Sequence, residues 1–114
     1  MQLINIGTDI EDVQRIARLK KNTLERVFTK AELDYCLASK NPAEHLAARF
    51  AAKEAVFKAL PFDEIALKKI EVIKDEYNKP QILIHDERAK KILFKLSISH
   101  TKKYATAFVI AYTK

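Results

Sequence analysis

Charged side chains spaced four residues apart mark one segment of this sequence as a place where chemistry could occur. Glu54 and Lys58 would share one face of a helix, and the spacing alone predicts a surface ion pair worth roughly 0.3–0.5 kcal/mol. Arg49 and Lys53 repeat the spacing with two cations, so that one edge of the same helix carries positive charge. Lys53 falls within the apolar arc of that helix, where it either extends along apolar surface to reach water or contacts an anion at a subunit boundary.

A second candidate carboxylate, Asp9, lies two residues after the only glycine of the chain, Gly7. The local pattern predicts that Asp9, or its neighbour Thr8, caps a helix. Alternatively, Asp9 ends the first strand and joins Glu54 in binding a hard cation. Mg²⁺ takes one or two protein carboxylates and completes its coordination with water and substrate phosphate. Two carboxylates with lysines nearby would then suit a diphosphate substrate.

His100 continues the inward phase of a predicted strand that includes Phe94 and Ile98. A single inward histidine is typical of a hydrogen-bonded core group. Its neighbours Ser99 and Thr101 supply hydroxyl groups that could bind a phosphate.

The helix that carries Glu54 is predicted over residues 42–60, with a proline in its first turn and Pro61 just beyond its end. Four apolar residues fall within one arc and are expected to pack on a core: Leu46, Phe50, Phe57 and Leu60. Five alanines cover the other sides and would let neighbouring elements approach closely: Ala47, Ala48, Ala51, Ala52 and Ala55.

Shorter elements are predicted before this helix. Residues 3–6 read as a buried strand, residues 10–20 as a helix, and residues 22–23 as the start of a short helical turn. Thr29 and Glu32 fit a capping box for a helix that reaches about Leu37.

The second half of the chain is predicted to consist mainly of strands. They cover residues 70–74, 81–84, 94–100 and 104–112. Asn78 lies in the connection of a hairpin and is expected to adopt the left-handed backbone conformation. Residues 85–91 are predicted to form a short helix. These elements predict a single α+β domain over residues 1–114, with an antiparallel sheet packed against one long helix and several short ones.

Composition excludes several classes of protein. The chain has 114 residues, a formal net charge of +6 and one cysteine, Cys36. The charge suggests an anionic partner, and a single glycine excludes a P-loop and a dinucleotide fingerprint. One cysteine excludes an internal disulfide and suits a reducing compartment, and we find neither a signal peptide nor a membrane span. We therefore expect a cytoplasmic protein, small enough that an active site would be shared between subunits.

Three segments, in this order, resemble holo-acyl carrier protein synthases, the small 4′-phosphopantetheinyl transferases of bacterial fatty-acid synthesis. They are GTDI (7–10) with Arg15-Ile16, RFAAKEA (49–55) with KAL (58–60), and SISHT (97–101) with Tyr104-Ala105. The linking segments TKAEL (29–33) and NKP (78–80) match as well, so the resemblance covers essentially the whole chain.

The resemblance implies an activity and an assembly. The family moves 4′-phosphopantetheine from coenzyme A to a serine of apo-acyl carrier protein and releases adenosine 3′,5′-bisphosphate. It depends on Mg²⁺ and forms a homotrimer with its sites between subunits. From the spread of the cations along the chain and the lack of a long apolar stretch, we expect neither a nucleic acid nor a membrane as partner.

The resemblance also implies roles for individual residues. Asp9 and Glu54 would hold the metal, Lys58 would contact the pyrophosphate, and Arg15 would meet the acidic carrier protein. The residues expected to help hold coenzyme A are Arg49, Lys53, Ser99, His100 and Thr101. The metal and Lys58 would offset the charge that builds on the diphosphate as its bond breaks. Glu54, or a water that it shares with the metal, is the candidate base for the serine proton.

The sequence departs from the usual pattern of the family at three places. Residues 61–63 stand where glycines are usual, as do Ala48 and Asn78. The loop after the long helix is therefore expected to have a different shape. No charged residue of the motifs is missing, which predicts an active enzyme.

Two other hypotheses compete with this one. A small basic nucleic-acid-binding protein would gather its cations on one sheet face with exposed aromatic side chains, whereas the cations here are spread along the chain. A trimer that had lost catalysis and served only as a scaffold would lack Asp9, Glu54 or Lys58, and all three are present.

Overall fold

The computed structural model describes all 114 residues. In chain order the elements are β1 (Gln2–Asp12), α1 (Val13–Ala17), α2 (Lys21–Val27), α3 (Lys30–Leu37), α4 (Pro42–Ala59), the 3₁₀ turn η1 (Leu67–Lys69), β2 (Ile70–Lys74), β3 (Pro80–Ile84), the 3₁₀ turn η2 (Glu87–Ala89), β4 (Leu93–His100) and β5 (Tyr104–Thr113). The predicted α+β class is confirmed, and no helix is long and apolar enough to span a bilayer.

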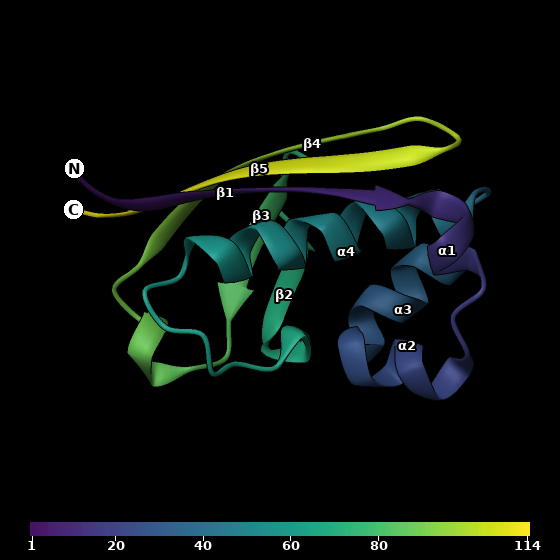
Figure 1. Cartoon of the computed structure of the whole chain (residues 1–114), viewed down its shortest axis with the longest axis horizontal. Coiled ribbons are helices and arrows are strands. Elements are labelled where there is room, and N and C mark those ends of the chain that lie inside the picture. Colours follow the sequence, from purple (N-terminus) through teal and green to yellow (C-terminus); the bar gives the residue numbers. More distant parts are fainter.

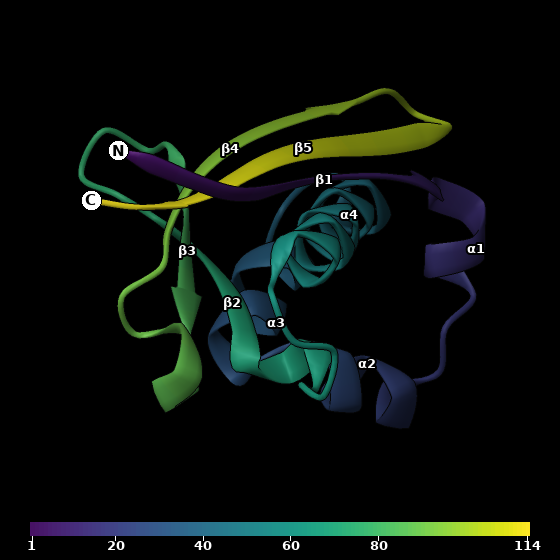
Figure 2. The same cartoon turned by 60° about the vertical axis from the view of Figure 1, so that its left-hand side comes forward.

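The molecule is organised around α4. A three-stranded antiparallel sheet in the order β1-β5-β4 lies over one side of this helix (Figure 1). The hairpin β2-β3 and the short helices α2 and α3 lie on the other sides, as the turned view in Figure 2 shows. The opposite face of the three-stranded sheet is left uncovered.

Alanines, and not the larger apolar residues, make the closest contact between α4 and the sheet. Ala51, Ala55 and Ala59 are fully buried, whereas Phe50 and Phe57 are only partly buried. The predicted arc does pack on the core, since Leu46 and Leu60 are buried, and the alanines allow the close approach that was expected of them. A Cβ atom on Gly7 would lie 1.9 Å from the carbonyl oxygen of Ala55. Gly7 is thus the residue that allows β1 to lie directly on α4.

The first strand is longer than predicted. β1 pairs with β5 from Gln2 to Asp12, so that Asp9 lies within the strand and neither ends it nor caps a helix. The cap of α1 is Asp12, whose carboxylate accepts hydrogen bonds from the backbone N–H groups of Gln14 and Arg15. Long-range pairing of the backbone outweighs the local turn signal of residues 7–9 here. The predicted helix over residues 10–20 is correspondingly reduced to Val13–Ala17.

Other local predictions are confirmed. Thr29 and Glu32 form both hydrogen bonds of the capping box that starts α3. Pro42 begins α4, which ends one residue before Leu60. Asn78 has a φ of 63° in the hairpin connection, as expected for a left-handed turn residue.

Candidate active site

Lys58 and Asp9 meet where β1 crosses the C-terminal half of α4. The Lys58 Nζ atom lies 3.2 Å from Asp9 Oδ1 and donates a hydrogen bond to the carbonyl oxygen of Thr8 at 2.9 Å. No ion pair forms between Glu54 and Lys58, so the pairing predicted from helical spacing was wrong. Because Gly7 brings β1 close to the helix, the lysine finds a partner across the interface instead of along its own helix.

Glu54 lies beside the same carboxylate. Burial, followed by the negative charge of Asp9, raises the pKa of Glu54, while Lys58 opposes the shift. The second carboxylate oxygen of Asp9, Oδ2, is buried and has no hydrogen-bond partner. A buried acceptor without a donor is costly, and a bound cation would satisfy it.

These residues fit a magnesium ion. The oxygen donors Asp9 and Glu54 match the preference of Mg²⁺ for one or two carboxylates. No group of three or more His, Cys, Asp and Glu side chains is arranged as a preformed metal site.

Glu11 is a third acidic residue of this site that the sequence analysis did not identify. It is buried on the same face of β1 as Asp9 and forms an ion pair with Arg15. Burial and the adjacent Asp9 raise the pKa of Glu11 to about 7. The sequence feature that could have identified Glu11 is its two-residue spacing from Asp9. This spacing places both side chains on one face of a strand, but only if the strand continues beyond residue 9.

Arg15 lies at the outer end of this row of charges. Its side chain is 57 % exposed, and its guanidinium lies 5.6 Å from the centre of the Phe50 ring. The pairing with Glu11 holds one nitrogen of the guanidinium, Nη2, while more than half of the side chain remains exposed.

A second polar cluster surrounds a pocket of about 200 Å³ on the other flank of α4. Its basic and aromatic lining residues are Tyr35, His45, Arg49, Lys74 and His100. The guanidinium of Arg49 lies 4.5 Å from the centre of the Tyr35 ring and donates a hydrogen bond to the Val72 carbonyl oxygen at 2.6 Å.

The two histidines of this pocket lie next to each other. The rings of His45 and His100 are 5.8 Å apart, and His100 Nδ1 lies 3.3 Å from a carboxylate oxygen of Glu44. Burial, followed by the positive charge of His100 and Lys74, lowers the pKa of His45. Such a concentration of cationic groups suits a phosphate ester. The predicted pair Arg49 and His100 is thus brought together, and Tyr35, His45 and Lys74 were not foreseen because they come from three separate elements.

Ser99 and Thr101 do not point into this pocket. Ser99 alternates with His100 along β4 and therefore faces the uncovered side of the sheet. The hydroxyl oxygen of Thr101 accepts hydrogen bonds from the backbone N–H groups of Lys103 and Tyr104 in the turn before β5.

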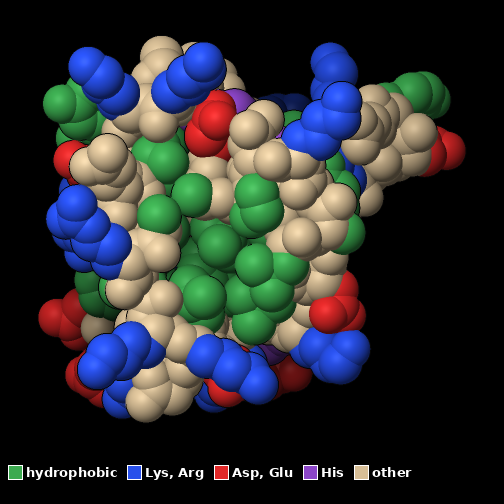
Figure 3. All heavy atoms as spheres, turned by 90° about the vertical axis from the view of Figure 1, so that its right-hand side faces the viewer, with side chains coloured by type: hydrophobic (Ala, Val, Ile, Leu, Met, Phe, Trp, Pro, Cys, Tyr) green, Lys and Arg blue, Asp and Glu red, His purple; other side chains and the backbone are tan.

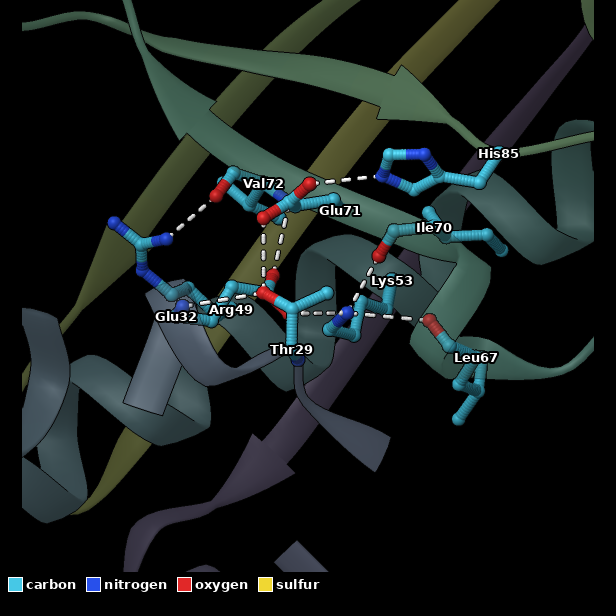
Figure 4. Close-up of polar contacts among 9 residues, drawn as sticks. All are labelled: Thr29, Glu32, Arg49, Lys53, Leu67, Ile70, Glu71, Val72 and His85. Carbon is cyan, nitrogen blue, oxygen red and sulfur yellow. Dashed lines mark hydrogen bonds and ion pairs between the residues drawn. The ribbon is translucent and has the colours of Figure 1, made fainter. Parts of the chain in front are cut away.

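Lys53 is a core residue. Its side chain is 0 % exposed, its Nζ atom lies 2.7 Å from Glu32 Oε1, and it donates hydrogen bonds to the carbonyl oxygens of Leu67 and Ile70. Figure 4 shows this network between α3, α4 and β2. Glu32 also accepts a hydrogen bond from the Val72 N–H at 2.9 Å. The structure contradicts the expectation that Lys53 contacts coenzyme A, because its three N–H groups are engaged inside the core.

The two polar clusters lie on opposite flanks of α4. Asp9 is on β1 and His100 is on β4, which are the two edge strands with β5 between them. The pocket around Arg49 includes neither Asp9, Glu54 nor Lys58. One copy of the chain therefore does not bring all of the predicted site residues together.

Comparison with known proteins identifies the family. The family model described as the 4′-phosphopantetheinyl transferase superfamily matches residues 5–111. This chain belongs to that superfamily. The holo-[acyl-carrier-protein] synthase of Chlamydia pneumoniae is 44 % identical, with 97 % of this chain and 98 % of the relative covered. The protein of the same name from Thermodesulfovibrio yellowstonii is also 44 % identical and covers 92 % and 95 % of the two chains.

Solved structures of this transferase superfamily agree with the fold. The holo-(acyl-carrier-protein) synthase of Bacillus anthracis, crystallised in complex with CoA (3′,5′-ADP), superimposes with a TM-score of 0.86 and is 32 % identical, with both chains fully covered. The Helicobacter pylori holo-[acyl-carrier-protein] synthase in complex with coenzyme A gives a TM-score of 0.81 at 32 % identity, covering 93 % and 98 % of the chains.

Proposed function

We propose that this chain is a holo-acyl carrier protein synthase. It transfers 4′-phosphopantetheine from coenzyme A to a serine of apo-acyl carrier protein and releases adenosine 3′,5′-bisphosphate. The observation that carries the proposal is the convergence of Asp9, Glu54 and Lys58 between β1 and α4, within a chain that matches such synthases along almost its full length. The alternative of a nucleic-acid-binding protein has no support among these relatives.

Asp9 and Glu54 would hold Mg²⁺. When bound, the ion would help to neutralise the diphosphate of coenzyme A. Lys58 adds a positive charge on the same side, because its ammonium lies 3.2 Å from Asp9 and its side chain is half exposed. Glu54, whose pKa is raised, accepts the serine proton either directly or through a water.

The nucleotide end of coenzyme A would bind in the pocket around Arg49 and His100. Its charge is suited to phosphate, and its aromatic side chains to the edge or face of a base. The pocket and the Asp9 cluster of the same copy lie on different flanks of α4. Completing one site therefore calls for a second copy of the chain.

The uncovered face of the three-stranded sheet supplies the surface for that assembly. Ile6 is 53 % exposed, Ile10 63 % and Phe108 44 %, and Ile6 pairs with Ile110 in the strand register. An exposed apolar face of this kind marks a protein–protein interface. We infer a homotrimer in which each site takes Asp9, Glu54 and Lys58 from one copy and Arg49 and His100 from its neighbour.

The carrier protein would dock at the end of the molecule that carries α1. Figure 3 shows a central hydrophobic area on this end with Lys and Arg side chains around its rim. Partly exposed apolar residues of this region include Leu19, Leu24 and Phe50. Arg15 forms an ion pair with Glu11, beside the Asp9 cluster. Such a surface is complementary to an acidic partner with an apolar ridge, and its charge would speed the encounter.

The activity can be tested with purified components. The chain is mixed with apo-acyl carrier protein, coenzyme A and Mg²⁺, and the carrier is weighed by mass spectrometry. A gain equal to one phosphopantetheine is expected. If the carrier mass stayed unchanged while an established synthase modified the same preparation, the proposed function would be wrong.

A further inference from the structure

Arg15 is the only cation between α1 and the end of α2 whose side chain is held by another part of the chain. Its Nη2 atom donates a hydrogen bond to Glu11 Oε1, and the two residues form an ion pair. The other cations of residues 13–27 form no side-chain hydrogen bond and no ion pair: Arg18, Lys20, Lys21 and Arg26. These four can attract an acidic partner from a distance, but they do not offer it a contact of fixed geometry.

Glu11 is a rigid anchor for the Arg15 guanidinium. Its side chain is 9 % exposed and lies on β1 opposite Ala105, which is fully buried in β5. Asp12, the next residue, caps α1 and accepts a hydrogen bond from the Arg15 backbone N–H at 3.2 Å. Both the backbone and the side chain of Arg15 are therefore tied to the end of β1.

The ring of Phe50 gives the guanidinium a second support. Arg15 Cζ lies 5.6 Å from the centre of this ring, a distance at which a cation is attracted to an aromatic face. Phe50 itself packs on Phe28, with 6.3 Å between the ring centres, and Phe28 is completely buried. A carboxylate of β1 and an aromatic ring of α4 thus hold the same guanidinium.

Most of the hydrogen-bonding capacity of this guanidinium is unused within the chain. Of its five N–H groups, one on Nη2 donates to a protein acceptor. More than half of the side chain is exposed. A planar guanidinium can bind a carboxylate through two parallel hydrogen bonds, so the remaining donors of Arg15 suit an acidic side chain of a partner.

We propose that Glu11 is a positioning residue for carrier binding, and that it acts by holding Arg15 ready to receive a carboxylate of the acidic carrier protein. The inference rests on the proposed function, which supplies the carrier as the partner. An arginine that is free in solution loses rotational freedom when it binds. Because Glu11 and Phe50 already restrict Arg15 in the free chain, less freedom is lost on docking and the carrier binds more tightly.

Two substitutions of Glu11 separate this effect from that of its charge. Glu11→Gln removes the negative charge but keeps an oxygen that can accept the hydrogen bond from Arg15. Glu11→Ala removes both the charge and the acceptor. Repulsion of an acidic carrier and any influence on the proposed metal ligand Asp9 depend on the charge, and both variants lose it equally. The difference between the two variants therefore measures the hold on Arg15.

The test measures the Kd for a carrier protein whose acceptor serine is replaced by alanine, so that no transfer occurs. We expect the Kd of Glu11→Ala to exceed that of Glu11→Gln roughly three- to tenfold, as for one long side chain that must be ordered on binding. In an Arg15→Ala background the two Glu11 variants should agree within about twofold, because no guanidinium is left to hold. Glu87→Ala also breaks an ion pair, with Lys90 in the segment that carries η2, and is the control that should bind as the wild type does.

Equal Kd values for Glu11→Ala and Glu11→Gln would overturn the inference, and so would a difference that persists in the Arg15→Ala background. A parallel rise in the KM for coenzyme A would show a general disturbance and would also contradict it. Circular dichroism establishes that each variant is folded. Glu11→Met, which keeps the length of the side chain without an oxygen, tests the same point if Glu11→Ala does not fold. A wild-type chain that did not bind the carrier would instead contradict the proposed function, so the two failures are distinguishable.

Discussion

The ammonium of Lys58 lies 3.2 Å from the carboxylate of Asp9, although the two residues are 49 positions apart and Glu54 is one turn away on the same helix. This pair links the strand and the helix on which the proposed chemistry depends. It forms because Gly7 has no side chain and β1 can therefore lie directly against the backbone of α4. The only glycine of the chain thus determines the geometry of the site.

Gly7→Ala should consequently be strongly destabilising. A Cβ atom would lie 1.9 Å from the Ala55 carbonyl oxygen, so the strand or the helix would have to move. We expect a loss of about 2–3 kcal/mol in the free energy of unfolding, within the range for overpacked cores. Urea denaturation measures this directly, with the exposed neighbour Thr8→Ser as control. A loss below about 0.5 kcal/mol, the usual size of a surface effect, would show that the contact is not tight.

Metal binding should depend on both proposed ligands. Asp9→Asn and Glu54→Gln each remove one negative oxygen donor and are expected to abolish Mg²⁺ binding in calorimetry. The exposed Glu76→Gln is the matched control and should bind as the wild type does. Retention of wild-type affinity by either ligand variant would contradict the assignment.

Lys58→Gln should lower the transfer rate while leaving the fold intact. The side chain is half exposed, so its loss costs little stability, whereas it faces the charge that builds on the diphosphate. The loss of one such group typically costs about two to three orders of magnitude in rate. The measurement is kcat at saturating coenzyme A and carrier protein. A rate within about threefold of the wild type would remove Lys58 from the proposed mechanism.

The metal-free protein should become less stable as the pH rises from about 4.5 to about 7. The pKa of Glu11 is raised to about 7 in the folded state, so the folded chain binds more protons than the unfolded chain in this window. Proton release on unfolding then makes the free energy of unfolding fall with increasing pH. Urea midpoints at pH 5 and pH 7.5 test this, and Glu11→Gln should flatten the slope. A slope unchanged in Glu11→Gln would show that another group is responsible.

Removing one partner of the buried ion pair between Lys53 and Glu32 should lower the free energy of unfolding much more than replacing both partners together. Lys53→Met leaves a carboxylate in the core without its cation, and we expect a loss of about 3–5 kcal/mol. The double variant with Glu32→Leu should recover a large part of that loss. Equal stability of the single and double variants would indicate that water reaches Glu32 after the substitution.

Local patterns predicted some helix starts and one turn correctly, because their determinants are close in sequence. The capping box at Thr29, the start of α4 at Pro42 and the left-handed Asn78 are all confirmed. The end of β1 could not be predicted in the same way, since its length is set by pairing with β5 at the other end of the chain. That error concealed Glu11 and placed Asp9 at a strand end.

The site residues also divide into those that the sequence predicted correctly and those that depend on tertiary contacts. Motifs identified Asp9, Glu54 and Lys58, and the structure places them together. The helical spacing that suggested a cationic edge was misleading for Lys53, because Glu32 and two carbonyl groups lie on that side of α4. Tertiary contacts between elements, which spacing does not encode, decide whether a charged residue on this helix serves the core or the site.

The proposed sharing of the active site between copies can be tested by complementation. Asp9→Asn and the double variant Arg49→Gln/His100→Ala are each expected to be inactive alone, because each lacks one half of the site. When the two chains are co-expressed and purified as mixed oligomers, some sites combine Asp9 from one copy with Arg49 and His100 from the other. We predict that phosphopantetheine transfer to the carrier protein returns in the mixture. A mixture that contains both chains in one oligomer and remains as inactive as its parents would contradict the shared site.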